Sequence, residues 1–239
     1  MARILVISDI HGNYPALQAV AKQADIAQCD YIVNCGDCTV YAPFSNEVLD
    51  WLIEHDAISI RGNTDDKVVK LLKGKDFKKP GKAEKKIMYT HTAETLTRKN
   101  RSILKGLKKE KKLEVANRRI GLFHGSPAKH TEFLFGQTPD ERFRQLALDC
   151  SADIIITGHS HSPYHKIIAN THFINPGSVG RMFDGIPQTS FAILELDKKK
   201  VQVDLYRCAY DVEQVVAGIR DANLPDIYAD MYRLGRKLN

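Results

Sequence analysis

The sequence predicts an α/β fold in a single domain over residues 1–239, and three observations support that prediction. Short apolar runs rich in β-branched residues alternate with amphipathic helical stretches, as in a buried sheet covered by helices. A length of 239 residues is within the range of one domain. The chain has 43% hydrophobic and 27% charged residues and no apolar run of about 20 residues. We therefore expect neither disorder nor a membrane span.

The first elements follow one another in a regular order. Five apolar runs predict strands, over residues 4–7, 31–33, 57–60, 120–123 and 154–156. Apolar residues at three- and four-residue spacing predict helices over residues 14–24, 43–54, 65–72 and 139–150. Polar residues follow each predicted strand. Because ligands in open α/β sheets bind at the carboxyl ends of strands, we expect these polar residues to meet at one site.

A lysine-rich stretch interrupts the alternation between about residues 73 and 119. We expect a helical insertion or cap there, with a helix over residues 92–107. Residues 67–119 contain 19 Lys and Arg against 5 Asp and Glu, a local net charge of +14, so the remainder of the chain carries −8. One interpretation is a solvated helical surface; the other is an electropositive rim that attracts phosphate-bearing substrates or nucleic acid.

The end of the chain predicts a second sheet and two helices. Short strands are expected over residues 164–168, 171–174, 188–196 and 200–206, and helices over residues 211–220 and 225–237. The N-terminus lacks the features of a signal peptide, so we expect a cytoplasmic protein. Five cysteines are an odd number without a regular spacing, which favours reduced thiols.

Seven polar residues at the ends of the five strands supply two carboxylates, one amide oxygen and four imidazoles: Asp9, His11, Asp37, Asn63, His124, His159 and His161. This mixed set of donors suits Mn, Fe or Zn and has too many nitrogen atoms for calcium. Seven side chains are too many for one tetrahedral site, but they give four contacts to each of two ions if Asp37 bridges them. A single histidine at a strand end is more often a polar cap. Seven polar residues with metal-binding side chains, at the ends of five strands, favour a metal site instead.

Five motifs occur in order: Asp9-Ile10-His11, Gly36-Asp37, Gly62-Asn63-Thr64-Asp65, His124-Gly125 and Gly158-His159-Ser160-His161, followed by Asn175-Pro176-Gly177-Ser178-Val179-Gly180. This order resembles the calcineurin-like metallophosphoesterases, and among them the small prokaryotic phosphodiesterases. The resemblance implies a two-sheet β-sandwich flanked by helices. It also implies one ion held by Asp9, His11, Asp37 and His161, and a second held by Asp37, Asn63, His124 and His159.

The function implied by the resemblance and the donor set is that of a metal-dependent phosphoric ester hydrolase. A hydroxide that bridges two divalent ions would attack a phosphodiester or phosphoanhydride in line. Manganese is the first expectation, with Fe, Ni, Zn or Mg as alternatives. Asp37, Asn63 and His124 would act through the metals and the bridging water, and Asp65 would support the imidazoles. The expected substrate is a small phosphoester or nucleotide.

Two other functions stay open at this point. A nuclease is suggested by the basic segment, and its binding of nucleic acid would depend strongly on salt. A catalytically silent scaffold is the second alternative, since a retromer subunit of this fold has lost metal ligands. The complete set of ligands in this sequence argues against the scaffold. Assembly into a homo-oligomer is also left open.

Two positions depart from the family pattern. Many members carry a histidine that can protonate the leaving group where this chain has Thr64, whose hydroxyl is a poor acid near neutrality. Aryl esters, cyclic nucleotides and phosphoanhydrides are therefore favoured substrates, and His91 or His130 would be substitute acids. Relatives often have Gln-Pro-Arg where this chain has Arg181-Met182-Phe183. The expected substrate-binding residues are Asn13, His130 and Arg181, whereas Trp51, Phe133 and Phe135 are predicted to be core.

Overall fold

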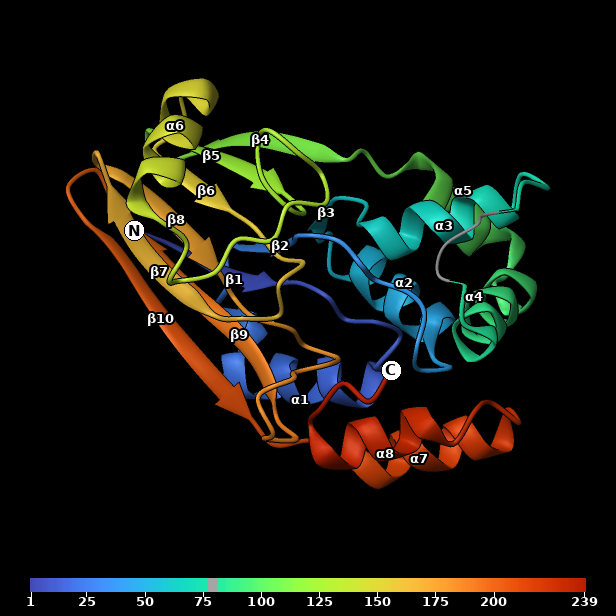
Figure 1. Ribbon diagram of the computed structural model, residues 1–239. Coiled ribbons are helices and arrows are strands. Elements are labelled where there is room, and N and C mark those ends of the chain that lie inside the picture. The colour runs from blue at the N-terminus through green and yellow to red at the C-terminus, as the bar shows by residue number, and fades with distance from the viewer. Residues whose placement is uncertain (77–80) are drawn as a thin grey trace.

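Two five-stranded sheets face each other and are flanked by helices, as expected from the sequence. The computed structural model describes residues 1–76 and 81–239. Figure 1 shows the two sheets together, with helices α3 (Asn63–Leu71), α4 (Ala83–Thr95) and α5 (Arg98–Gly106) at the far end from the turn between β9 (Thr189–Leu196) and β10 (Val201–Cys208). None of the helices in those two ranges is long and apolar enough to span a membrane.

The first sheet is built around β1 (Ala2–Ile7), the first apolar run of the sequence. β1 pairs in parallel with β2 (Tyr31–Asn34) and antiparallel with β9 (Thr189–Leu196). β3 (Ile58–Ser59) and β10 (Val201–Cys208) are the two edges, giving the order β10-β9-β1-β2-β3.

The second sheet has the order β4-β5-β6-β8-β7. Its parallel centre consists of β5 (Arg118–Phe123), β6 (Ile154–Ile156) and β8 (Thr171–Asn175), and antiparallel edges are added by β4 (Glu110–Val115) and β7 (Tyr164–Ile168). Of the five strands that precede the polar motifs, β5 and β6 thus belong to the second sheet, whereas β1, β2 and β3 belong to the first.

The alternation of side chains along β1 separates two cores. Ile4 and Val6 face the second sheet and pack with Ile120 and Ile156, whereas Leu5 and Ile7 belong to the core under the helices. These four side chains are fully buried, so β1 contributes to the cores on both of its faces.

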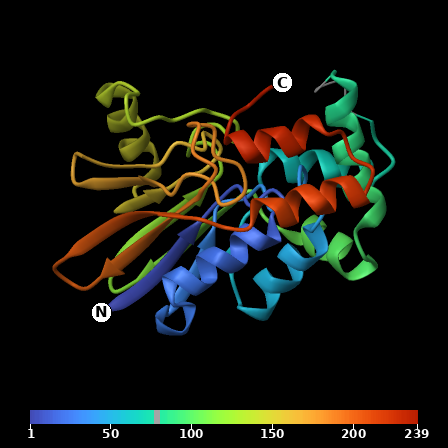
Figure 2. The ribbon, with the colours of Figure 1, turned by 90° about the horizontal axis from the view of Figure 1, so that it is seen from below.

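The helical layers cover the outer faces of the sheets. The first sheet packs with α1 (Tyr14–Ala24), α2 (Ser45–Glu54), α7 (Val212–Asp221) and α8 (Ile227–Leu234), and a 3-10 turn, η1, follows α1 at Ile26–Gln28. Figure 2 shows α7 and α8 side by side next to α1. The second sheet is covered by α6 (Asp140–Cys150), whose Phe143 packs edge-on against Phe173.

The lysine-rich segment differs from its prediction in two ways. Its helical part consists of α4 (Ala83–Thr95) and α5 (Arg98–Gly106), not one helix over residues 92–107. The helix is interrupted at Leu96 because the Asn46 side chain bonds to the backbone there: it accepts a hydrogen bond from the Thr97 N–H and donates one to the Thr95 carbonyl. The Thr97 hydroxyl then caps the N-terminus of α5. Residues 110–115 form strand β4, so the segment ends inside the second sheet. Lys78 and Lys79 of this segment lie outside the described residues.

Candidate metal centre

The seven predicted metal-ligating side chains meet where the strands of both sheets end. Asp9 and His11 follow β1, Asp37 follows β2, and Asn63 is the first residue of α3 (Asn63–Leu71), just after β3. His124 follows β5, and His159 and His161 follow β6. The ligand atoms form two groups whose members lie within 4.8 Å of one another: Asp9, His11 and His161 in one, and Asp37, His124 and His159 in the other. The Asn63 Oδ1 atom lies 3.0 Å from His124 Nε2 and so joins the second group.

Five of these residues have a backbone conformation that residues other than glycine rarely adopt. The φ angles are positive at Asp9, His11, Asp37, His159 and His161. Such conformations cost free energy and cluster at functional sites. A neighbouring glycine allows the close approach of the two sheets: a Cβ atom on Gly158 would lie 2.6 Å from Asp9 Oδ2. The loops therefore hold the ligands at the expense of backbone strain.

Backbone carbonyls orient three of the four imidazoles. The Nδ1 atoms of His11, His124 and His161 lie 3.4, 2.8 and 2.5 Å from the carbonyl oxygens of Thr39, Cys35 and Arg181. A carbonyl can only accept a hydrogen bond, so each Nδ1 carries the proton. In a neutral ring, the Nε2 lone pair then points into the site.

The resulting contacts place acceptor against acceptor. His11 Nε2 and His161 Nε2 are 3.2 Å apart. Asp9 Oδ1 and His159 Nε2 are buried without a hydrogen-bond partner in the described part of the chain. Facing lone pairs and orphaned buried acceptors repel unless a cation lies between them, so the donor set fits divalent metal ions.

The carboxylates give the site a buried negative charge. Burial raises the pKa of Asp9, but the neighbouring His161 outweighs it and the pKa is lowered to about 2. The pKa of Asp37 is likewise lowered, because His124 and His11 outweigh its burial. Among residues 1–76 and 81–239, neither carboxylate forms an ion pair with Lys or Arg.

The pKa values of the imidazoles are shifted in opposite directions by their surroundings. Burial lowers the pKa of His11 to about 3 and that of His159 to about 4, which keeps both rings neutral and able to bind metal. Burial also lowers the pKa of His124, but the adjacent Asp37 carboxylate outweighs it and raises the pKa to about 10. In the absence of a cation, this histidine would carry the positive charge that compensates Asp37.

Asp65 has a different position from the one predicted. Its carboxylate accepts hydrogen bonds from the Thr39 and Cys38 N–H groups, the Thr39 hydroxyl and the Gly62 N–H. It ties the loop after β2 to the start of α3 and contacts none of the four imidazoles, three of which are oriented by carbonyls instead. Burial, followed by the charge of Asp37, raises the pKa of Asp65 to about 6.

Two of the three predicted substrate-binding residues do not line the pocket. Asn13 is fully buried: its Oδ1 accepts the Ala16 N–H at the start of α1, and its Nδ2 donates to the Gly180 carbonyl. His130 lies beside His124, with its Nε2 3.5 Å from Asp66 Oδ2. His91, a suggested substitute acid, lies in a separate surface hollow beside Leu224.

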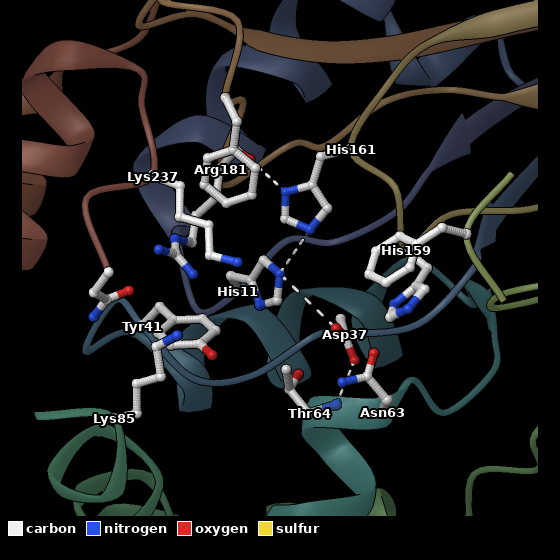
Figure 3. Close-up of a pocket in the computed structure, with 13 residues that line it drawn as sticks. His11, Asp37, Tyr41, Asn63, Thr64, Lys85, His159, His161, Arg181 and Lys237 are labelled. Atoms are coloured by element: carbon white, nitrogen blue, oxygen red, sulfur yellow. Dashed lines mark hydrogen bonds and ion pairs between the residues drawn. The ribbon is translucent and has the colours of Figure 1, made fainter. Parts of the chain in front are cut away.

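The pocket wall also contains residues that the sequence did not indicate. Thr64 and Arg181 line it as expected, and they are joined by Tyr41, Lys85, Phe133, Phe183, Lys237 and Asn239. Figure 3 shows several of these around His11 and Asp37. The prediction that Phe133 is core was wrong: it is 56% exposed and stacks on His159 at 4.1 Å between ring centroids. Phe183 stacks on His161 in the same way, at 4.7 Å. Trp51 is buried, as predicted.

A sequence model of the calcineurin-like phosphoesterase superfamily domain matches residues 2–199. The chain belongs to this superfamily. A curated relative, protein MJ0912 of Methanocaldococcus jannaschii, is 29% identical over 255 residues, 98% of each chain.

Two solved structures have the same fold over nearly the whole chain. A metallophosphoesterase from Sphaerobacter thermophilus has a TM-score of 0.81 at 23% identity, covering 98% of this chain and 99% of that one. Protein PH1004 of Pyrococcus horikoshii has a TM-score of 0.86 at 18% identity, covering 99% and 100%. The superfamily match and the shared fold are thus consistent with a site that has two groups of candidate metal ligands.

Proposed function

We propose that this chain is a phosphodiesterase that uses two divalent ions, with manganese as the first choice of metal. The observation that carries the proposal is the position of one oxygen atom. Asp37 Oδ2 lies 3.9 Å from His11 Nε2 in the first ligand group and 3.5 Å from His124 Nε2 in the second. A single carboxylate is thus near the donors of both groups, as a bridging ligand requires.

The residues around Asp37 fix its orientation. The Thr64 N–H donates a hydrogen bond to Asp37 Oδ1 at 2.8 Å, which leaves Oδ2 directed into the site. When bound, two ions would supply Lewis acidity, a water of lowered pKa and neutralisation of phosphoryl charge. The neutral imidazoles of His11 and His159 would contribute donors without adding charge, and Asp9 and Asp37 would balance the charge of the cations.

The leaving-group side supports the choice of substrate. Thr64 lines the pocket, and its hydroxyl lies 3.5 Å from the Thr39 carbonyl oxygen, so no imidazole stands at this position. A threonine hydroxyl contributes little as a general acid. The proposed substrates are therefore phosphodiesters or phosphoanhydrides with leaving groups that depart without strong protonation.

The test uses protein stripped of metal and refilled separately with Mn, Mg, Ni, Fe or Zn. A panel of aryl phosphodiesters, aryl phosphomonoesters, cyclic nucleotides and pyrophosphate is assayed, and bound metal is counted. We expect two ions per chain and diester hydrolysis that exceeds monoester hydrolysis. Retention of two ions without hydrolysis of any ester would favour the silent scaffold instead.

The structure gives the nuclease alternative little additional support. Among the described lysines and arginines of residues 67–119, Lys85 alone lines the pocket. Lys109 is paired with Asp66 at 2.6 Å, which reduces its free charge.

A further inference from the structure

The pocket has two chemically different sides. The metal side consists of the five candidate metal ligands that line the cavity, which are His11, Asp37, Asn63, His159 and His161. The opposite side, which we call the cationic side, consists of Arg181, Lys85 and Lys237. Figure 3 shows these three side chains and Tyr41 on one side of His11, with Asp37, Asn63 and His159 on the other. All of these residues line the same cavity.

Arg181 is a buried cation without an acidic partner. Arg181 is only 8% exposed. No carboxylate in residues 1–76 or 81–239 forms an ion pair with its guanidinium. The guanidinium instead lies 3.9 Å from the centroid of the Tyr41 ring, and its Nη2 contacts Met231 Sδ at 3.1 Å. A buried charge is costly unless an opposite charge compensates it, so this position favours an anionic ligand.

Two lysines from other parts of the chain extend this positive charge. Lys85 comes from α4 and is half-buried, whereas Lys237 follows α8 and is exposed. Burial, followed by the charges of Lys237, Lys82 and Arg181, lowers the pKa of Lys85. The nearby Glu84 carboxylate accepts a hydrogen bond from Asn239 Nδ2, and neither lysine has a salt bridge in the described structure.

Tyr41 contacts a residue of each side. Its ring centroid lies 5.2 Å from that of His11, and the Arg181 guanidinium packs over the ring at 3.9 Å from the centroid. The Tyr41 hydroxyl is 3.2 Å from the Tyr89 hydroxyl on α4, and the Val40 and Tyr41 backbone has positive φ angles of 75° and 79°. One aromatic ring, held in a strained loop, therefore contacts both the guanidinium and a candidate metal ligand.

We propose that Arg181, Lys85 and Lys237 bind a second phosphate group, so that the substrate is a small phosphodiester carrying a further, non-scissile phosphate. This inference rests on the proposed phosphodiesterase function. The positive charge of the subsite carries the argument: three cations attract a phosphate dianion, and a guanidinium binds phosphate oxygens through two parallel hydrogen bonds. The metal side would take the scissile phosphoryl group.

The first test measures binding and needs no turnover. Thymidine 3′,5′-bisphosphate and thymidine 5′-monophosphate are titrated calorimetrically into the metal-loaded protein. The wild type is expected to bind the bisphosphate with a Kd about tenfold lower, the effect of roughly one charge-assisted hydrogen bond. The double variant Lys85→Gln/Lys237→Gln should lose this preference. Lys86→Gln, which removes the same charge from an exposed position of α4, should retain it.

The second test measures hydrolysis of a matched pair of substrates. One is thymidine 5′-(p-nitrophenyl phosphate), and the other carries an additional 3′-phosphate. Water adds to the 5′ phosphorus and p-nitrophenolate leaves, so release of the coloured product reports both reactions. The ratio of kcat/KM between the two substrates should favour the phosphorylated one about tenfold and fall towards one in the double variant.

The two tests separate the failure of this inference from that of the proposed function. Lack of hydrolysis of either substrate with every metal would overturn the phosphodiesterase activity, while the calorimetric preference would still decide the phosphate subsite. Equal Kd values for the two thymidine nucleotides in the wild type would overturn the subsite. A preference undiminished in the double variant would overturn it as well. Because Lys85 is half-buried and Lys237 exposed, the double variant is expected to fold; Arg181→Gln, at a buried position, serves as a supplementary variant only.

Discussion

The metal side and the cationic side of the pocket are held by different kinds of structure. Most of the candidate metal ligands stand on short loops after strands; five of the seven have positive φ angles, and backbone carbonyls hold three of the four imidazole rings. The cations stand on the loop after β8, on α4 and on the segment after α8, and two of them are long lysine side chains. The candidate metal ligands are thus positioned by the sheets, and in the proposed function small errors of position would cost most there. The residues of the proposed phosphate subsite come from peripheral elements outside the two sheets.

The largest effect is expected from removing the carboxylate near both ligand groups. Asp37→Ala should lower kcat by roughly three orders of magnitude and reduce bound metal more than Asn63→Ala, because Asn63 belongs to only one group. Elemental analysis and diester hydrolysis measure the two effects. Asp50→Ala removes an exposed carboxylate paired with Lys99 and is the control. Equal metal loss in the Asp37 and Asn63 variants would argue against a bridging carboxylate.

A second prediction concerns the close contact between the sheets on the metal side. Gly158→Ala should destabilise the protein by about 1–3 kcal/mol, because the new methyl group would lie 1.9 Å from Ser8 Oγ and 2.6 Å from Asp9 Oδ2. Denaturant unfolding measures the free energy. Gly106→Ala is the control: no atom lies within 4 Å of the added carbon at that helix end. A Gly158→Ala protein as stable as the wild type would show that the sheets are not closely packed at this point.

The third prediction concerns the leaving group. If its protonation is limiting, rates should fall steeply as its pKa rises, and Thr64→His should raise kcat for poor leaving groups by about tenfold. A series of aryl phosphodiesters measures the slope, and a melting curve checks that the variant folds at this buried position. Rates independent of leaving-group pKa, with chemistry shown to be limiting, would contradict the prediction.

The smallest effect is expected from the field of the lysine-rich segment. Replacing Lys105, Lys108, Lys109 and Lys111 by Gln should lower kcat/KM a few-fold at low ionic strength, leave kcat nearly unchanged and lose its effect as salt rises, because the Debye length is about 8 Å at physiological salt.

The control for this experiment replaces Lys22, Lys198, Lys199 and Lys200 by Gln. Residues 198–200 lie at the turn between β9 and β10, and Leu196 pairs with Ala2, so this turn is at the end of β1 opposite to the metal ligands. An equal loss in both sets would indicate a general effect of net charge, and no loss in either would indicate a solvated surface.

The sequence alone determined the metal side. Each candidate ligand is adjacent in sequence to a strand that is recognisable by its own apolar residues, and strand ends of this fold converge, so local pattern was sufficient. The sequence did not determine which sheet each strand joins: β9 and β10 lie late in the chain but pair onto β1, a choice made by packing between distant apolar runs. The break between α4 and α5 depends on Asn46, about fifty residues away. The cationic side brings together residues 85, 181 and 237, and the stacking of Phe133 on His159 joins two loops. Only the tertiary structure could decide these contacts, because the free energy that selects them comes from burial and charge between residues remote in sequence.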